Sequence, residues 1–364
     1  MSKILVLANH YNTLRIFRRE LLKELVLKGN EVILSIPKTD ENNIKVLEGY
    51  GCRVLITDFQ RRGINPVKEF TLLMKHIKLI KLENPDKVIT YTIKPNIYGS
   101  VASKICAKQH YVNVTGLGSA FQSQNITRKV VSFLYRISLN KANKIFFENI
   151  GNRDTLIKEK IIKIENTVVL PGAGVNLQEF SFTEYPNNND IINFLFIGRI
   201  MKEKGVDELF IAIKRIALDF PNAKFHFIGW YEDDYQNKVQ LLEKKKLISY
   251  QGFQPDVKPF IKDSHCVILP SYHEGMSNTL LEAASMGRPL ITSNIHGCKE
   301  AVIHGRTGYL VNVKDSDDLY KKIRKFIELP YEDKVMMGQQ SREYIREIFD
   351  KSKVVEKTIR EMGL

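Results

Sequence analysis

Short apolar runs alternate with helical patterns along the first half of the chain. Seven runs have the length and the Val and Ile content of buried strands: Ile4–Ala8, Val32–Ile36, Val54–Ile56, Lys87–Tyr91, Tyr111–Val114, Lys144–Phe147 and Thr167–Leu170. Helical periodicity lies between them, near 14–28, 66–82, 96–107 and 125–140. This alternation predicts a parallel sheet covered by helices on both faces.

The alternation of strand and helix patterns stops at 171–189, where Pro, Gly and a run of Asn predict a linker. It then restarts with six further strand patterns: Ile192–Ile197, Lys224–Ile228, Ile248–Tyr250, Val267–Leu269, Leu290–Thr292 and Tyr309–Val311. The fold class is therefore α/β, with two Rossmann-like, doubly wound domains. The boundaries we expect are 1–175 for the first domain, 176–189 for the linker and 190–345 for the second. A helical tail, 346–364, should pack back on the first domain. Ligands bind such sheets at the carboxyl ends of their strands, so we expect a cleft between the domains.

Composition narrows the class of protein. With 364 residues, 43% of them hydrophobic and 26% charged, the chain can bury two cores and is not mainly disordered. It has no apolar run of membrane-spanning length, and its start lacks a signal-peptide pattern, so we expect it to stay in the cytoplasm. The four cysteines lie far apart and predict neither a disulfide framework nor a zinc site.

The net charge of +14 lies entirely in the first half. Residues 1–175 hold 28 Lys and Arg against 14 Asp and Glu, whereas residues 176–364 hold 27 of each kind. This asymmetry predicts an anionic partner for the first domain alone, and a basic surface that only aids solubility is the alternative.

A basic loop opens the second domain. The sequence Gly198-Arg-Ile-Met-Lys-Glu-Lys-Gly205 follows a predicted strand and precedes a helix. Arg199 and Lys204 therefore flank a helix N-terminus at the edge of the sheet, which suits a phosphate group. A solvated surface loop is the alternative interpretation.

A second loop, starting at Leu269, carries two carboxylates. Ser277 or Asn278 can cap the helix that follows and leave amides pointing at an anion. Glu274 precedes this helix and Glu282 lies two turns inside it. Carboxylates repel phosphate, so neutral hydroxyls of a sugar and a ribose suit them better. For either residue alone, a capping or solvated acid is the simpler explanation.

Together the two loops spell Gly-Arg-x4-Lys-Gly and, about seventy residues later, Glu-Gly-x6-Glu-Ala-x3-Gly-x-Pro. This pair resembles the retaining glycosyltransferase family 4, which has the GT-B fold. The resemblance implies that Arg199 and Lys204 hold the donor diphosphate and that amides at Ser277, Asn278 and Thr279 add to that site. It also implies that Glu282 binds the donor ribose, that Glu274 acts as the catalytic residue on the transferred sugar, and that the base lies near 252–254.

The first domain resembles the family more loosely. The segments beginning at Lys94 (Lys-Pro-Asn-Ile-Tyr-Gly-Ser) and at Thr115 (Thr-Gly-Leu-Gly-Ser-Ala) look like those of bacterial members that build lipid-linked polysaccharides. The family's Gly-rich first loop is replaced by Asn9–Thr13, and a family histidine is missing near Gly116. His10, or the amides of 116–119, could contact the donor sugar instead, and a loop histidine without a role is the alternative.

The expected activity is transfer of a hexose or N-acetylhexosamine from a UDP-sugar to a diphospholipid-linked saccharide, with retention. No cofactor is expected, and no metal, because the histidines are scattered and Asp315-x-Asp317 reads as a helix cap. A GT-B UDP-sugar epimerase is the alternative enzyme. A basic nucleic-acid-binding protein is the alternative class, although no nucleic-acid-binding motif supports it and we expect no nucleic acid partner.

Membrane contact is expected from the basic first domain, at the inner face of the cell membrane. The helix near 66–82 places Phe70, Leu73, Met74, Ile77 and Ile80 on one face and lysines on the other. It is either a surface-membrane helix or a helix packed on its sheet. Cations expected to hold the domain on anionic lipid are Arg15, Arg18, Arg19, Arg61, Arg62, Lys75 and Lys78.

Overall fold

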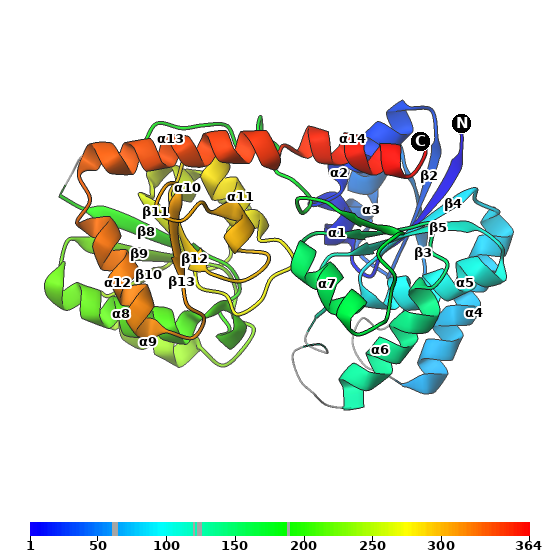
Figure 1. Cartoon of the computed structure of the whole chain (residues 1–364), viewed down its shortest axis with the longest axis horizontal. Coiled ribbons are helices and arrows are strands. Elements are labelled where there is room, and N and C mark those ends of the chain that lie inside the picture. The colour runs from blue at the N-terminus through cyan, green and yellow to red at the C-terminus, as the bar shows by residue number, and fades with distance from the viewer. Residues whose placement is uncertain (60–64, 119–120, 122–125, 188–189) are drawn as a thin grey trace. The chain divides into compact units, whose positions relative to one another are not determined.

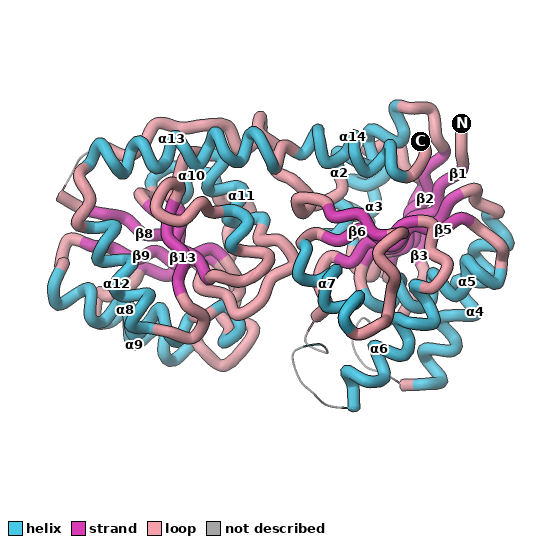
Figure 2. The backbone as a smooth tube through the Cα atoms, viewed as in Figure 1, coloured by secondary structure: helices cyan, strands magenta, loops and turns pink. Residues whose placement is uncertain are grey.

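A computed structural model describes residues 1–59, 65–118, 121, 126–187 and 190–364. The chain divides into two compact units (Figures 1 and 2). Unit 1 comprises residues 1–173 together with 352–364, and unit 2 comprises residues 174–351. Arg61, Arg62 and Ser119 lie outside the described residues.

Unit 1 is built on a parallel sheet of seven strands in the order β3-β2-β1-β4-β5-β6-β7. Its strands are β1 Lys3–Leu7, β2 Glu31–Ile36, β3 Arg53–Ile56, β4 Lys87–Tyr91, β5 Gln109–Val114, β6 Lys144–Phe147 and β7 Thr167–Val169. All seven predicted strands are present, with ends displaced by at most two residues. Because the chain steps outward from β1 in one direction and then in the other, the sheet is doubly wound, as predicted.

Two helical layers cover this sheet. Its helices are α1 Tyr11–Arg15, α2 Arg19–Leu27, α3 Glu41–Glu48, α4 Pro66–Glu83, the π-helix η1 Pro95–Gly99, α5 Ser100–Ile105, α6 Ile126–Leu139, α7 Ile150–Lys158 and α14 Lys351–Glu361. Side chains alternate along β1: Ile4 and Val6 join a core with α2 and α14, whereas Leu5 and Leu7 join a core with α4 and α5. The described helices α4, α5 and α6 therefore share one face, and α2 and α14 lie on the other.

Unit 2 repeats the plan with six parallel strands in the order β10-β9-β8-β11-β12-β13. Its strands are β8 Ile192–Ile197, β9 Ala223–Ile228, β10 Ser249–Tyr250, β11 Cys266–Leu269, β12 Leu290–Ser293 and β13 Gly308–Val311. Its helices are η3 Lys202–Lys204, α8 Val206–Asp219, α9 Gln236–Lys244, α10 Lys258–Asp263, α11 Asn278–Ser285, η4 Lys299–Ala301, α12 Ser316–Ile327 and α13 Tyr331–Ile348. The winding direction reverses between β8 and β11, which is where such sheets bind ligands.

The predicted helix over 14–28 is two helices, α1 and α2, because the chain turns at Arg18. Its guanidinium is buried, with the side chain 9% exposed, and it donates to a carboxylate oxygen of Glu148 at 2.5 Å. It also lies over the Tyr91 ring at 5.0 Å. A paired, buried cation offers nothing to a lipid surface, so the expectation that Arg18 binds membrane is wrong.

Helix α4 buries a different stripe from the one predicted. The buried positions are Glu69, Leu72, His76, Ile77, Ile80 and Glu83. Burial lowers the pKa of His76 to about 4, so this side chain enters the core as neutral imidazole. The helix consequently turns Phe70 and Met74 toward solvent, where they are 64% and 48% exposed.

Candidate functional site

Two loops meet where the winding of unit 2 reverses. Arg199 follows β8, and the segment 270–277 follows the neighbouring strand β11. The backbone N–H of Tyr272 donates to the carbonyl of Glu203 at 2.8 Å, which ties the loops together. Gly205 has a φ of 70°, and a Cβ there would lie 2.1 Å from the carbonyl oxygen of Pro270. Only glycine allows this approach, so the motif's last glycine fixes the geometry of the site.

The predicted cations and one predicted carboxylate lie together. Lys204 forms an ion pair with Glu274, with side chains 17% and 14% exposed, and Ser271 donates to the same carboxylate at 2.8 Å. Arg199 contacts the carboxylate of Glu232 at 3.3 Å and is 39% exposed. Ser271 and Glu232 carry no motif signal on their own, and sequence reasoning missed both.

The imidazole of His273 lies among the charged groups of the two loops. Partial burial lowers its pKa, and Glu274, Lys204, Glu203 and Arg199 all contribute electrostatically. One imidazole therefore lies within electrostatic range of both predicted phosphate ligands and of Glu274. A site that holds two cations, each paired with a carboxylate, can accept an anion and a polar neutral group side by side.

The helix α11 begins at this site. Ser277 occupies its N-cap position, but its side chain makes no capping hydrogen bond. The N–H of Ser277 donates instead to the carbonyl of Gly297 at 2.9 Å. The first-turn amides, including those of Asn278 and Thr279, thus receive no side-chain cap from Ser277 and suit an anion.

A third loop, after β12, supports the second. A Cβ on Gly297, whose φ is 89°, would lie 2.6 Å from the carbonyl oxygen of Glu274. The Glu300 carboxylate accepts from the Gly297 N–H at 2.7 Å and contacts Nδ1 of His296 at 2.7 Å. Gly297 and Glu300 therefore stabilise the loop that carries Glu274.

Glu282 has different neighbours from Glu274. Its electrostatic partners are Lys351, which lowers its pKa, and Glu179, which raises it. Burial is the largest influence and raises the pKa to about 7. The structure therefore does not pair Glu282 with Lys204, and this carboxyl stays protonated well above the usual pH range of a glutamate.

This pKa predicts a pH-dependent cost to stability. Between about pH 4.5 and 7 the folded state retains the Glu282 proton, whereas the unfolded state releases it. The contribution of Glu282 to the free energy of unfolding therefore falls as the pH rises. We expect Glu282→Gln to gain stability relative to wild type across this window, by up to about 3 kcal/mol. Thermal unfolding of both proteins from pH 4.5 to 8 measures the difference. A difference that is constant with pH would contradict the assignment. Glu179→Gln should move the transition to lower pH.

The candidate residues of unit 1 also share one sheet edge. His10, Lys94 and Thr115 with Gly116 follow β1, β4 and β5, which are adjacent parallel strands. His10 occupies the N-cap of α1, and its Nδ1 accepts from the N–H of Asn12 at 3.1 Å. Helix capping is therefore one role of His10, while its contact with a donor sugar stays a prediction.

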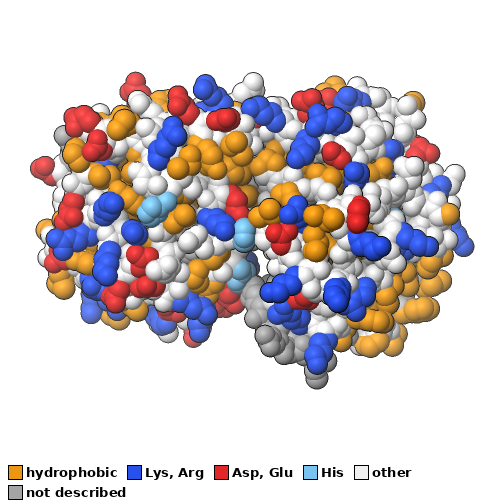
Figure 3. All heavy atoms as spheres, in the orientation of Figure 1, with side chains coloured by type: hydrophobic (Ala, Val, Ile, Leu, Met, Phe, Trp, Pro, Cys, Tyr) orange, Lys and Arg blue, Asp and Glu red, His pale blue; other side chains and the backbone are white. Residues whose placement is uncertain are grey.

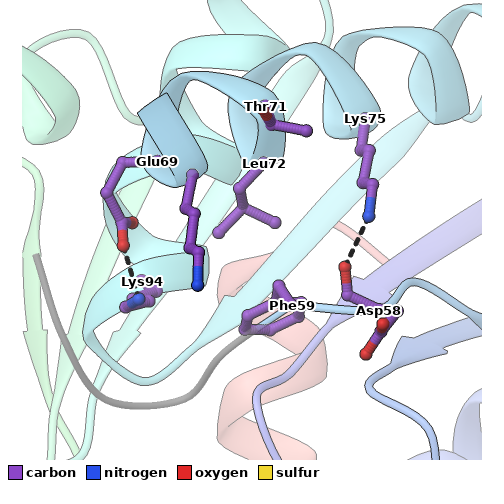
Figure 4. Close-up of a pocket in the computed structure, with 8 residues that line it drawn as sticks. Asp58, Phe59, Glu69, Thr71, Leu72, Lys75 and Lys94 are labelled. Atoms are coloured by element: carbon purple, nitrogen blue, oxygen red, sulfur yellow. Dashed lines mark hydrogen bonds and ion pairs between the residues drawn. The ribbon is translucent and has the colours of Figure 1, made fainter. Parts of the chain in front are cut away.

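A pocket of about 270 Å³ lies beside Lys94 (Figure 4). Its lining residues come from the loop after β3, from α4 and from the loop after β4: Asp58, Phe59, Lys68, Glu69, Thr71, Leu72, Lys75 and Lys94. Lys94 pairs with the buried Glu69 at 2.5 Å, and Lys75 donates to the carbonyl of Asp58 at 2.7 Å. The lining holds three lysines and two acids, so the pocket is basic, and the ring of Phe59 forms part of its wall.

Asp315 accepts from the N–H groups of Asp317 and Asp318 at 3.1 and 2.9 Å, so the predicted helix cap is confirmed.

Within the described residues, no group of three His, Cys, Asp or Glu side chains could hold a metal ion. None of the helices searched in that part of the chain is both long and apolar enough to cross a membrane.

Comparison with known proteins identifies the family. Residues 178–344 match the model "Glycosyl transferases group 1" and residues 3–149 match "Glycosyl transferase 4-like". The chain is 27% identical over 332 residues to the N,N'-diacetylbacillosaminyl-diphospho-undecaprenol alpha-1,3-N-acetylgalactosaminyltransferase of Campylobacter jejuni, with 86% of each chain covered. It is 28% identical over 279 residues to the UDP-Gal:alpha-D-GlcNAc-diphosphoundecaprenol alpha-1,3-galactosyltransferase of Escherichia coli, with 70% of each covered.

Solved structures agree on the fold. Anabaena HepE, crystallised in complex with UDP and glucose, superposes with a TM-score of 0.81 at 17% identity and full coverage of both chains. The predicted pair of parallel, doubly wound sheets and the predicted family are both confirmed. The chain belongs to the glycosyltransferases with the GT-B fold, of the family 4 type.

Proposed function

We propose that this glycosyltransferase moves a hexose or N-acetylhexosamine from a UDP-sugar to a saccharide linked to a lipid diphosphate, with retention of configuration. The observation that carries the proposal is the site at the β8–β11 reversal. There Arg199, the Lys204–Glu274 pair and the N-terminus of α11 lie around one loop crossing. This combination suits a diphosphate beside a sugar.

The proposed chemistry uses charge and position. Arg199, Lys204 and the amides of Asn278 and Thr279 stabilise the negative charge that develops on the leaving diphosphate. Glu274 accepts hydrogen bonds from hydroxyls of the transferred sugar and fixes its orientation. The bond from the anomeric carbon to the diphosphate oxygen breaks, and the acceptor oxygen bonds to that carbon on the same face. The acceptor's proton passes to the leaving diphosphate.

The acceptor class is inferred from two supports. Both relatives named above act, by their names, on sugars joined to undecaprenol through a diphosphate. The excess charge of +14 in residues 1–175 and the three lysines around the unit 1 pocket suit a diphosphate group (Figure 4). We place the acceptor in unit 1, with Lys94, Thr115 and Gly116 on the edge that receives it. The enzyme would then work at the cytoplasmic face of the membrane, attached peripherally.

Two alternative functions, a UDP-sugar epimerase and a nucleic-acid-binding protein, are less well supported. A UDP-sugar epimerase of the same fold needs no acceptor, so the basic unit 1 and the acceptors named for both relatives count against it. A nucleic-acid-binding protein is set aside, because the chain is a glycosyltransferase and charge alone suggested that class.

The donor can be tested separately from the acceptor. We expect UDP-hexoses or UDP-N-acetylhexosamines to raise the melting temperature and to be hydrolysed slowly, while GDP- and ADP-sugars do neither. Thermal shift and chromatography of the released nucleotide measure both effects. Stabilisation by GDP- or ADP-sugars alone would replace the donor in this proposal.

Metal should not be needed for transfer. In the proposed site, the cations of Arg199 and Lys204 and the N-terminus of α11 would neutralise the diphosphate in place of a divalent ion. We expect the transfer rate in excess EDTA to stay within about twofold of the untreated rate, since no contact to the diphosphate is lost. Activity that EDTA abolishes and magnesium or manganese restores would contradict this expectation.

A further inference from the structure

Three helices form one outer face of unit 1. Helices α4 and α5 pack on the sheet through Ile77, Ile80 and Ala102, and α6 packs on the same side through Val131 and Tyr135. Their outward sides carry large apolar side chains that are exposed to solvent.

Two of these helices carry matching apolar stripes toward solvent. On α4 the stripe is Val67, Phe70 and Met74, and on α6 it is Val130, Phe133 and Ile137, so both have the same i, i+3, i+7 spacing. The two phenylalanines are 64% and 58% exposed. Ile105 of α5 is 57% exposed. Figure 3 shows hydrophobic side chains gathered at the lower right edge of unit 1, over α4 and α5. Stripes of this regularity differ from scattered surface residues and mark an interaction site.

The charges on these helices have one sign at the surface. The acidic residues of α4, Glu69 and Glu83, are both buried and ion-paired, and α5 and α6 contain no acidic residue. The basic residues are Lys68, Lys75, Lys78, Lys81, Lys104, Arg128, Lys129 and Arg136. On the opposite face of the sheet, α2 carries Glu20 and Glu24 beside its own basic residues. Arg128 pairs with Glu159, which follows α7, but the cations of these three helices still outnumber the acids on the face that carries the apolar stripes.

We propose that the α4–α5–α6 face docks on an anionic lipid bilayer, with the apolar stripes inserted among the headgroups and acyl chains and the basic residues on lipid phosphates. A basic, amphipathic helical surface is the arrangement that binds such interfaces. Charge argues against a second copy of this chain as the occupant, since two such faces would bring like charges together. The expectation from sequence was electrostatic attachment alone; the exposed phenylalanines add an apolar anchor.

This inference deepens the proposed function, because a lipid-linked acceptor lies in a bilayer. It also places the pocket beside that bilayer: α4 carries Lys68, Leu72 and Lys75 of the pocket as well as the stripe with Phe70. Vesicle binding needs neither donor nor acceptor, so it can be tested even if the proposed transfer is wrong.

The experiment is flotation of the full chain with vesicles of phosphatidylcholine, with and without phosphatidylglycerol. The first variant is Phe70→Ser with Phe133→Ser, and the second is Lys78→Glu with Lys129→Glu. The matched control is Leu27→Ser, because Leu27 is 79% exposed on α2, on the other face of the sheet. UDP binding, which uses unit 2, verifies that each variant is folded.

We expect binding to the anionic vesicles to fall about tenfold or more in each double variant and to remain unchanged in Leu27→Ser. Added salt should weaken wild-type binding without abolishing it, because the inserted rings are not screened. Transfer to a short-chain, water-soluble acceptor should survive in both variants. The proposal is overturned if the phenylalanine variant binds vesicles like wild type, or if that variant instead dissociates an oligomer of the free protein.

Discussion

Lys204→Ala should weaken UDP binding by tenfold or more, and Arg199→Ala by a similar factor. A charge-assisted hydrogen bond to phosphate contributes about 1.5–3 kcal/mol, and each 1.4 kcal/mol is about tenfold in affinity. The Lys204 variant should be the weaker binder, because it also leaves the carboxylate of Glu274, only 14% exposed, beside the phosphate without its cation. Isothermal titration with UDP measures both.

Lys202→Ala is the matched control, since it removes an exposed lysine from the same loop. Its affinity for UDP should equal that of wild type. The double variant Lys204→Ala with Glu274→Gln should recover part of the loss, because the unpaired carboxylate is gone. Wild-type affinity in both single variants would show that these cations bind something other than a diphosphate.

Glu274→Gln should separate binding from turnover. Removing its charge frees Lys204 from the ion pair, so UDP should bind as tightly as to wild type or more tightly. Turnover should nevertheless fall roughly 10- to 100-fold, the loss of 1.5–3 kcal/mol of contact to the sugar hydroxyls in the transition state.

Steady-state kinetics with a UDP-sugar, set beside the UDP affinity, tests this separation. Glu328→Gln serves as the control, since Glu328 pairs with Arg324 on the surface of unit 2. If Glu274→Gln weakens UDP and leaves turnover intact, the carboxylate only positions Lys204.

The strands were predictable because a parallel sheet covered on both faces demands continuous apolar runs, such as Phe194 to Ile197. The break between α1 and α2 was not, since it depends on the buried pair of Arg18 with Glu148, 130 residues further along the chain. Helices α3 and α7, of eight and nine residues, were overlooked; each is short and buries a single side chain, Leu47 or Leu156.

In the candidate site, too, local motifs could be predicted and contacts between distant residues could not. Arg199, Lys204, Glu274 and Ser277 could be named in advance because their spacing forms a motif. The Lys204–Glu274 ion pair could not, because it depends on how closely Gly205 approaches Pro270. Likewise, the outward turn of Phe70 on α4 could not be predicted, because Glu69, His76 and Glu83, which a hydrophobic pattern counts as polar, lie on the buried face of the helix.

The most direct test of the account supplies the purified enzyme with a labelled UDP-hexose or UDP-N-acetylhexosamine and a saccharide joined to polyprenyl diphosphate. Label in the lipid fraction and the anomeric configuration of the new linkage are both measured. We predict transfer of label to the lipid-linked saccharide in an α-linkage, which is retention because the donor is itself α-linked. Conversion of the UDP-sugar to its epimer with no label in the acceptor, or a β-linked product, would contradict the account.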